Sequence, residues 1–132
     1  MPHVLIEVRR EWSHEEEAGL IDAVHGALVE AFGIAPDNRH VRLLVHAPHR
    51  FAVPPSLARP ELYTSVHIDC FDGRTAQTKR LLYRRIVERL EELGIPADHT
   101  AITVREIPAT NWGIRGGRAA ADLDLGRDTP RP

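Results

Sequence analysis

The chain contains one structural plan written twice. The segments "GIAPDN" at residues 33–38 and "GIPADH" at residues 94–99 each end a helix-like stretch, and each precedes a run of alternating apolar residues. Another alternating run stands before each helix-like stretch, "HVLIEVRR" at residues 3–10 and "SVHIDCF" at residues 65–71. Alternation with a period of two predicts strands. A strand, a helix and a strand, repeated once, constrain the fold strongly because each unit must bury one apolar face.

Both expected helices carry start and stop signals. In the first, Ser13 and Glu16 have the spacing of a capping box, and Gly33 is expected to end the helix. In the second, Thr75 is the expected N-cap. Apolar residues recur at a spacing of about 3.6 residues, which predicts one buried stripe on each helix. The stripes consist of Ile21, Val24, Leu28 and Phe32 in the first helix and Leu82, Ile86, Leu90 and Leu93 in the second.

We therefore predict an α+β fold in which duplicated β-α-β units form a four-stranded sheet. The strands of each unit pair in parallel, and right-handed crossovers place both helices on one face. The units span about 2–47 and 64–106, with a proline-rich linker loop at 48–63. A C-terminal segment, 107–132, is expected to add short strands or a hairpin. Residues 1–132 are expected to form one domain.

The opposite face of the predicted sheet has no helix to cover it. Its apolar and charged side chains are too mixed for either a solvent surface or a full core, so packing against other copies in a closed ring is expected. We predict a homo-oligomer, with a trimer favoured. The residues expected on this face are Leu5, Leu44 and Phe71 beside Glu7, Arg42 and Asp69.

Composition excludes several classes of partner. The net charge is −2 and no long block of like charge occurs, so nucleic acid is not an expected partner. No apolar stretch approaches the roughly 20 residues that a membrane span needs, and the N-terminus lacks the layout of a secretory signal. We expect a cytoplasmic protein that does not bind membranes.

Cofactor and metal signals are also missing. Cys70 is the single cysteine, which excludes an internal disulfide, and its place in an alternating run predicts a buried, inert thiol. His46 and His49 have no carboxylate or cysteine near them in the sequence, which argues against a metal site. No glycine-rich phosphate loop follows a strand, and Gly116 and Gly117 stand in the wrong context for one. We expect neither cofactor nor metal.

Pro2, directly behind Met1, has two interpretations. A proline cannot donate to a strand ladder, so it suits the start of an edge strand. Alternatively, removal of Met1 leaves Pro2 with a free secondary amine, a reactive group that no internal residue offers. An α-amine titrates near 7.7–8.0 in model peptides, and burial near arginines lowers that pKa toward the value useful for a general base.

These features together resemble the tautomerase superfamily. The resemblance covers nearly the whole chain: Pro2, the doubled plan, "GRTAQTKRLLY" at 73–83 and "NWGIRGGRAAADLDLG" at 111–126. The phrases "DAVHGALVEAFGI" and "NWGIRGGRA" are most similar to the branch of malonate semialdehyde decarboxylase. The resemblance implies a trimer with the proline at the floor of each pocket. In tautomerases this proline is a general base on 2-oxo acids or their enols, whereas in the decarboxylase and hydratase branches it stays protonated.

The resemblance also implies a carboxylate-binding arginine. Arg74 stands where the family has an arginine at the entry to the second helix, and a guanidinium there can grip a carboxylate in bidentate fashion and stabilise an enolate oxygen. The alternative is a solvated residue, although the dipole of the following helix disfavours a cation there. The decarboxylase branch has a second arginine just before this one, and here Phe71 and Asp72 replace it.

Three further positions follow from the resemblance. The branch uses an aspartate in the loop after the first helix, and an ungapped match places Asn38 there, with Asp37 one residue earlier. Asp37 is therefore either the catalytic carboxylate, after a small shift of the loop, or a purely structural residue, as Asp98 is at the equivalent repeat position. Trp112 is implied as an apolar wall of the pocket, although packing alone explains it nearly as well.

Three functions remain open from the sequence. The leading hypothesis is a cofactor-independent tautomerase that uses Pro2 on a small carboxylate substrate, a phenylpyruvate-like or 2-hydroxydienoate-like 2-oxo acid. The second is a lyase, a decarboxylase or hydratase with a protonated proline, which the missing second arginine disfavours. The third is a non-catalytic trimeric binding protein on the same scaffold.

Overall fold

The computed structural model describes residues 2–125. Met1, whose removal is expected, and residues 126–132 of the predicted C-terminal segment lie outside the described residues. The main elements, in chain order, are β1 (His3–Val8), α1 (His14–Phe32), β2 (Val41–Val45), β3 (Thr64–Cys70), α2 (Ala76–Glu91), β4 (Thr100–Glu106), β5 (Gly113–Ile114) and β6 (Arg118–Ala119).

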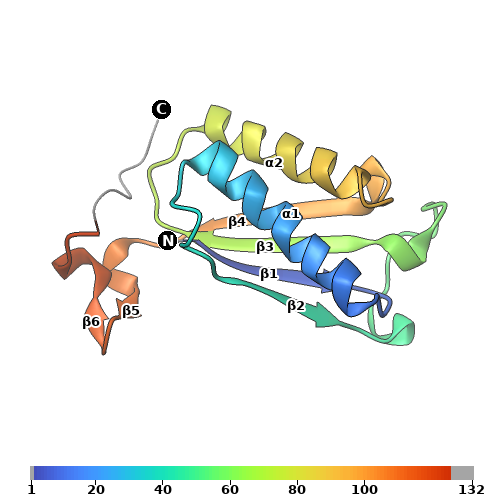
Figure 1. Ribbon diagram of the computed structural model, residues 1–132, viewed down its shortest axis with the longest axis horizontal. Helices are drawn as coiled ribbons and strands as arrows, with labels where there is room; N and C mark the ends of the chain where they lie inside the picture. The colour runs from blue at the N-terminus through green and yellow to red at the C-terminus, as the bar shows by residue number, and fades with distance from the viewer. Residues whose placement is uncertain (1, 126–132) are drawn as a thin grey trace.

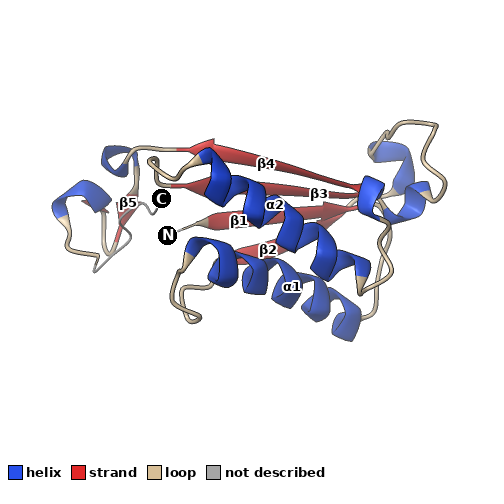
Figure 2. Cartoon of the chain, turned by 90° about the horizontal axis from the view of Figure 1, so that it is seen from above, coloured by secondary structure: helices blue, strands red, loops and turns tan. Residues whose placement is uncertain are grey.

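The four long strands form one mixed sheet in the order β2-β1-β3-β4. Within each unit the pairing is parallel, β1 with β2 and β3 with β4, whereas the central pair β1 and β3 is antiparallel. Both helices lie on the same face of this sheet (Figures 1 and 2). The short strands β5 and β6 form a separate antiparallel hairpin after β4. The predicted α+β fold, with duplicated β-α-β units and a C-terminal hairpin, is confirmed.

The helix start and stop signals act as predicted, and one residue of the predicted buried stripes is misplaced. The Ser13 hydroxyl accepts from the backbone N–H of Glu16 in a complete capping box, and Thr75 accepts from the N–H of Thr78. Gly33 ends α1 in the left-handed conformation, with φ of 68°. Leu93 was wrongly expected on the buried stripe: α2 ends at Glu91, so this leucine lies past the helix and is exposed.

The core lies between the helix layer and one face of the sheet. Side chains that alternate along β1 and β3 point into it, because successive residues of a strand face opposite sides. The stripes of α1 and α2 close the other side. The core residues without measurable exposure include Val4, Ile6, Leu20, Val24, Leu28, Val66, Ile68, Leu82, Ile86 and Leu90.

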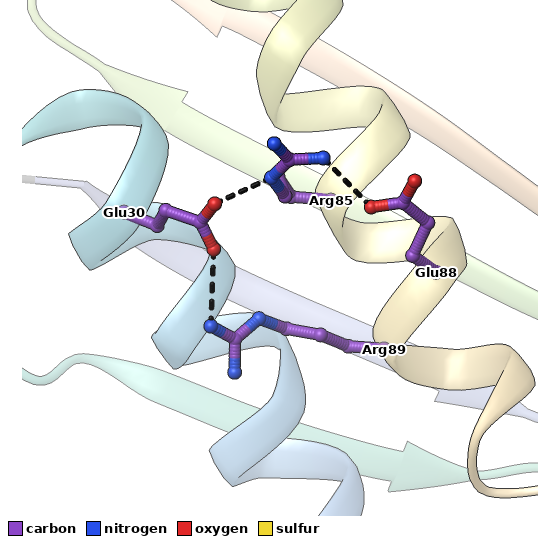
Figure 3. A network of polar contacts seen from close by, with 4 residues as sticks. All are labelled: Glu30, Arg85, Glu88 and Arg89. Atoms are coloured by element: carbon purple, nitrogen blue, oxygen red, sulfur yellow. Dashed lines mark hydrogen bonds and ion pairs between the residues drawn. The ribbon is translucent and has the colours of Figure 1, made fainter.

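A polar network joins the outer surfaces of the two helices. The Glu30 carboxylate on α1 accepts from the guanidiniums of Arg85 and Arg89 on α2, and Arg85 Nη1 donates to Glu88 Oε1 at 2.8 Å (Figure 3). Arg85 and Arg89 together hold the pKa of Glu30 below its usual value. Because these groups are solvent-exposed, the network orients the helices more than it stabilises the fold.

The face of the sheet away from the helices is open in the single chain. Leu5, Glu7, Arg42, Leu44 and Asp69 lie on it as expected. Phe71 follows β3, which ends at Cys70, and its ring contacts Trp112 beyond the strand. Within residues 2–125, neither helix is long and apolar enough to cross a lipid bilayer.

Candidate active site

The strand directions bring all five predicted site residues to one end of the sheet. The N-terminal end of β1 lies beside the start of parallel β2 and beside the end of antiparallel β3. The loops 33–40 and 71–75 and the segment 107–112 therefore meet there, and Figure 1 shows the start of β1 at the same end as the β5–β6 hairpin. This end of the sheet, called the site end below, holds Pro2, Asp37, Asn38, Arg74 and Trp112.

Pro2 is buried at the start of a central strand. The register pairs His3 with Asp69, so continuing it by one residue brings Pro2 level with Cys70. Pro2 and Val4 share the face toward the helices, since burial alternates along the strand. The edge-strand interpretation is therefore wrong, because β1 is hydrogen-bonded to a neighbour on each side.

Arg74 spans the gap between the two helices. Its Nη1 donates to the carbonyl oxygen of Phe32 at 2.9 Å, and its guanidinium carbon lies 4.1 Å from the centroid of the Phe32 ring. Phe32 is the last residue of α1, so the guanidinium lies at the negative end of that helix dipole. The neighbouring helix thus compensates for the unfavourable position at the start of α2. The ring contact adds a cation–π attraction.

The loop that carries Arg74 is held by a carboxylate at the end of β4. Glu106 Oε2 accepts from the backbone N–H of Gly73 at 3.1 Å, and Glu106 Oε1 lies 3.0 Å from Lys79 Nζ. The hydrogen bond from Lys79, and a further one from Gly73, keep the pKa of Glu106 below its usual value. Glu106 was not predicted from the sequence, because its contact with the loop appears only once β4 is known to lie beside β3, with Cys70 opposite Glu106.

A chain of rings closes the site end of the sheet. The Trp112 side chain is largely buried, and its Nε1 donates to the carbonyl oxygen of Ile107 at 3.0 Å. Its ring lies edge-on to Phe71 and His3, at centroid distances of 5.4 and 5.1 Å. His3 in turn lies 4.6 Å from His40. The sequence analysis expected Trp112 as a wall but missed both histidines.

The His3 imidazole is disfavoured as a cation. Burial lowers its pKa most, and the nearby His40 and Arg42 lower it further, while Asp69 acts in the opposite direction. A neutral ring next to Pro2 has two consequences. It adds no positive charge near the proline nitrogen, and it leaves a ring nitrogen able to accept a hydrogen bond.

The loop with the two candidate carboxylate positions is a tight turn. The backbone N–H of Asn38 donates to the carbonyl of Ala35 at 2.9 Å, and the buried His25 Nε2 donates to the carbonyl of Pro36 at 2.7 Å. The Asp37 side chain is exposed at the tip, whereas Asn38 is half-buried. The turn thus lies at the site end, and its shape is set by backbone contacts rather than by the Asp37 carboxylate.

Cys70 takes no part in the chemistry of this end. The thiol is buried, as predicted, and burial raises its pKa, although Arg74 acts in the opposite direction. A protonated buried thiol is a poor nucleophile. Of the predicted site residues, Pro2 contributes a backbone nitrogen at this end and Arg74 a guanidinium that contacts the Phe32 ring. Within residues 2–125, no group of three or more histidine, cysteine, aspartate or glutamate side chains is arranged so that it could hold a metal ion.

A proline at the start of a central strand, an arginine at the entry to the second helix and a doubled β-α-β fold define a tautomerase-like protein. Residues 38–115 match the model of the family described as "Tautomerase enzyme". The chain belongs to this tautomerase family.

Individual relatives agree with the family. A probable tautomerase of Bacillus subtilis (strain 168), YusQ, is 24% identical over 123 residues, which are 90% of this chain and 97% of the relative. A probable tautomerase of Ralstonia nicotianae, RSp0893, is 26% identical over 65 residues, 48% of this chain and 93% of the relative.

Two solved structures share the fold over nearly their whole length. FG41 malonate semialdehyde decarboxylase inhibited by 3-bromopropiolate is 25% identical, with a TM-score of 0.80, over 93% of this chain and 98% of the other. A fused 4-OT described as an asymmetric trimer is also 25% identical, with a TM-score of 0.76, over 95% and 99%.

Proposed function

We propose that this protein is a tautomerase that interconverts the keto and enol forms of small 2-oxo acids. In this proposal Met1 is removed and the Pro2 nitrogen acts as the general base. The observation that carries the proposal is the burial of Pro2 at the site end, beside the loop of Arg74. Removal of Met1 thus liberates the nitrogen of a residue that is buried in the structure.

The chemistry follows from the environment of the nitrogen. A free α-amine has a pKa near 7.7–8.0 in model peptides, and burial near cations favours its neutral form. The neutral amine removes a proton from the carbon beside the substrate carbonyl. The C–H electron pair becomes the C=C bond of an enolate as the C=O π pair moves to oxygen. The ammonium then gives that proton to the enolate oxygen, which yields the enol, or returns it to carbon. The proline ring restricts the direction of the lone pair, so little conformational freedom is lost when it is aimed.

Arg74 supplies the charge that the substrate and the enolate require. A guanidinium has five N–H donors in a planar fork, and in Arg74 the Nη1 group donates to the Phe32 carbonyl at 2.9 Å. We propose that the fork binds the substrate carboxylate and stabilises the negative oxygen as the proton leaves carbon. Trp112 and Phe71 give the site an apolar side, which suits a flat unsaturated or aryl group.

We also propose that the protein assembles as a trimer through the open face of its sheet. Leu44 on this face is 46% exposed in the single chain, and Leu5 lies on the same face. A solved structure with 25% identity is described as a trimer, and it covers 95% of this chain. Three copies that turn their open faces inward leave the helices outside.

Lyase chemistry is the second candidate, because one structural neighbour at 25% identity is a malonate semialdehyde decarboxylase. Decarboxylation of a 3-oxo acid needs a cation to polarise the carbonyl that accepts the electrons of the breaking C–C bond. A protonated Pro2 supplies that cation. Phe71 and Asp72 stand where that branch has its second arginine, so Arg74 is the cation proposed for the carboxylate. This arrangement favours the tautomerase.

The experiment is an ultraviolet assay of enol phenylpyruvate with the wild type, Pro2→Ala and the surface control Arg80→Ala. We expect Pro2→Ala to lower kcat by about 10²- to 10⁴-fold, the usual contribution of a general base. Arg80 is exposed on α2, so its replacement leaves the rate unchanged. Intact-mass analysis must show that the first residue is Pro2.

Two results contradict the proposal. One is equal rates for the wild type and Pro2→Ala, and the other is a wild type that retains Met1 and is still active. Carbon dioxide release from malonate semialdehyde, measured on the same three proteins, distinguishes the lyase. We expect little or none.

A further inference from the structure

The open face of the sheet carries a carboxylate held by two imidazoles. His46 Nε2 donates to Glu7 Oε1 at 2.7 Å, and His67 Nε2 lies 3.0 Å from Glu7 Oε2. The Ser65 hydroxyl lies 3.0 Å from the same nitrogen of His67. His46 has no carboxylate near it in the sequence, and the pairing of β1 with β2 and β3 creates this cluster.

A second ion pair lies farther along the same face. Asp69 accepts two hydrogen bonds from Arg105, at 2.7 Å from Nε and 2.9 Å from Nη2. Between this pair and the Glu7 cluster is a hollow of about 220 Å³, whose lining also includes His3, Leu5 and Arg42. The open face therefore holds most of the charged groups of the four strands.

The charges of the open face sum to zero only when its histidine imidazoles are neutral. Two carboxylates, Glu7 and Asp69, stand with two guanidiniums, Arg42 and Arg105, so the face is neutral while its imidazoles are neutral. Glu106, the remaining charged residue of the four strands, lies on the helix side, against Lys79. Histidine changes charge between about pH 5 and 8. Full protonation adds three positive charges to the face of each copy, on His3, His46 and His67.

We propose that this face packs against further copies of the same chain and that protonation of its three imidazoles separates the copies in mild acid. The inference rests on the assembly proposed above. A neutral face with an exposed Leu44 fits a second copy of itself, because burial there leaves no net charge uncompensated. In a ring, the same face from each copy points to the centre, so added cations repel one another across the interface.

The surroundings of His3 also predict that assembly weakens as the imidazole becomes protonated. Burial, His40 and Arg42 already lower its pKa in the single chain, and only Asp69 opposes them. Packing against another copy removes more water and brings more cations near, both of which disfavour the charged ring further. A group whose pKa is lowered by assembly binds fewer protons in the assembly than in the free chain. Assembly is therefore strongest above the pKa of the free imidazole and weakens as the pH falls through it.

The test is the mass of the particle in solution, measured by sedimentation velocity at about pH 8 and pH 5.5. The key variant is His46→Gln with His67→Gln, because the glutamine amide still donates to Glu7 but does not titrate. We expect the wild type to lose affinity between copies by about 100-fold or more in acid, and the double variant by clearly less. His14→Gln, exposed at the start of α1, is the matched control and behaves as the wild type.

Three outcomes overturn the inference. The first is a wild type that is a single chain at both pH values, and the second is a wild type and double variant with the same pH response. The third is unfolding at pH 5.5, seen by circular dichroism in the same buffers. Acid separation that is weaker in 1 M salt supports repulsion as the cause, because salt screens exposed charges. Failure here leaves the role of Pro2 intact, since that is read from turnover and not from mass.

Discussion

The two turns that close the helices share a sequence pattern but lie at opposite ends of the sheet. Residues 33–38 and 94–99 each begin with a glycine at positive φ, 68° at Gly33 and 91° at Gly94, and in each the following isoleucine is buried. Because β1 and β3 are antiparallel, the first turn meets the site end and the second meets the far end. Two turns of similar local structure thus lie among different neighbouring residues, one at the site end and one at the far end.

The aspartates of the two turns show what each end requires. At the far end, Asp98 accepts from Nδ1 of the buried His99 at 2.7 Å, and His99 Nε2 accepts from the backbone N–H of Arg59 at 3.1 Å. This relay ties the linker to the start of β4. At the site end Asp37 is exposed. The two aspartates therefore differ in their contacts: Asp98 holds a buried histidine at the far end, whereas Asp37 lies at the exposed tip of its turn.

The largest effect predicted from the comparison of the two ends comes from removing the guanidinium of Arg74 at the site end. We expect Arg74→Gln to lower kcat/KM by about 10²- to 10³-fold, the usual loss when one group that stabilises a developing negative charge is removed. Arg50→Gln, at an exposed position toward the far end, is the control and changes the rate little. The measurement is steady-state turnover of enol phenylpyruvate. Equal losses in both variants contradict the division between the two ends.

The starts and ends of the two helices were predictable from the sequence. The capping box at Ser13, the N-cap at Thr75 and the stop at Gly33 depend on residues a few positions apart, and all three occur as expected. Leu93 was misplaced because α2 stops at Glu91, two residues before the stripe would continue.

The contacts that shape the candidate site were not predictable, because they join distant segments. Phe71 was assigned to the open face, but its strand ends one residue earlier. Glu106 and Gly73 are 33 residues apart, and Glu7 and His46 are 39 apart. The order β2-β1-β3-β4, which brings such pairs together, is not encoded in any single stretch of sequence. The repeat and the resemblance nevertheless selected residues that all lie at one end.

The second prediction tests the far end. His99 is 1% exposed and takes part in two hydrogen bonds, so His99→Phe keeps a ring in the buried position but leaves the Arg59 N–H without its acceptor. We expect a loss of about 1–3 kcal/mol in the free energy of unfolding, the usual cost of a buried unpaired polar group. Urea unfolding measures it. His49→Phe, at an exposed position, is the control. Activity per folded molecule should not change.

A matched pair of substitutions sharpens the comparison further. Asp98→Asn weakens the acceptor for His99 Nδ1, and we expect it to reduce the free energy of unfolding by about 1 kcal/mol. Asp37→Asn, at the equivalent position of the first turn, should leave stability nearly unchanged, because within residues 2–125 the exposed Asp37 carboxylate has no hydrogen bond or ion pair comparable to that of Asp98. Urea unfolding of both variants, with turnover measured on the same samples, separates the two roles. A larger stability loss at Asp37 than at Asp98 would reverse our assignment of the two ends.

The smallest predicted effect lies in the helix layer between the two ends. A methyl group on Gly26 of α1 would stand 2.7 Å from Arg89 Nη1, so Gly26→Ala requires that flexible side chain to move. The helix gains about 0.8–1.0 kcal/mol from replacing glycine by alanine. Because Arg89 binds Glu30 in an exposed ion pair, its displacement costs little, and we expect a net stabilisation of about 0.5 kcal/mol. In an Arg89→Ala background, Gly26→Ala should raise the free energy of unfolding by nearly the full helical contribution of about 0.8–1.0 kcal/mol.

Urea unfolding of the wild type, the two single variants and the double variant measures the sign of the effect. If Gly26→Ala is destabilising in both backgrounds, backbone packing between α1 and α2, rather than Arg89, requires the glycine.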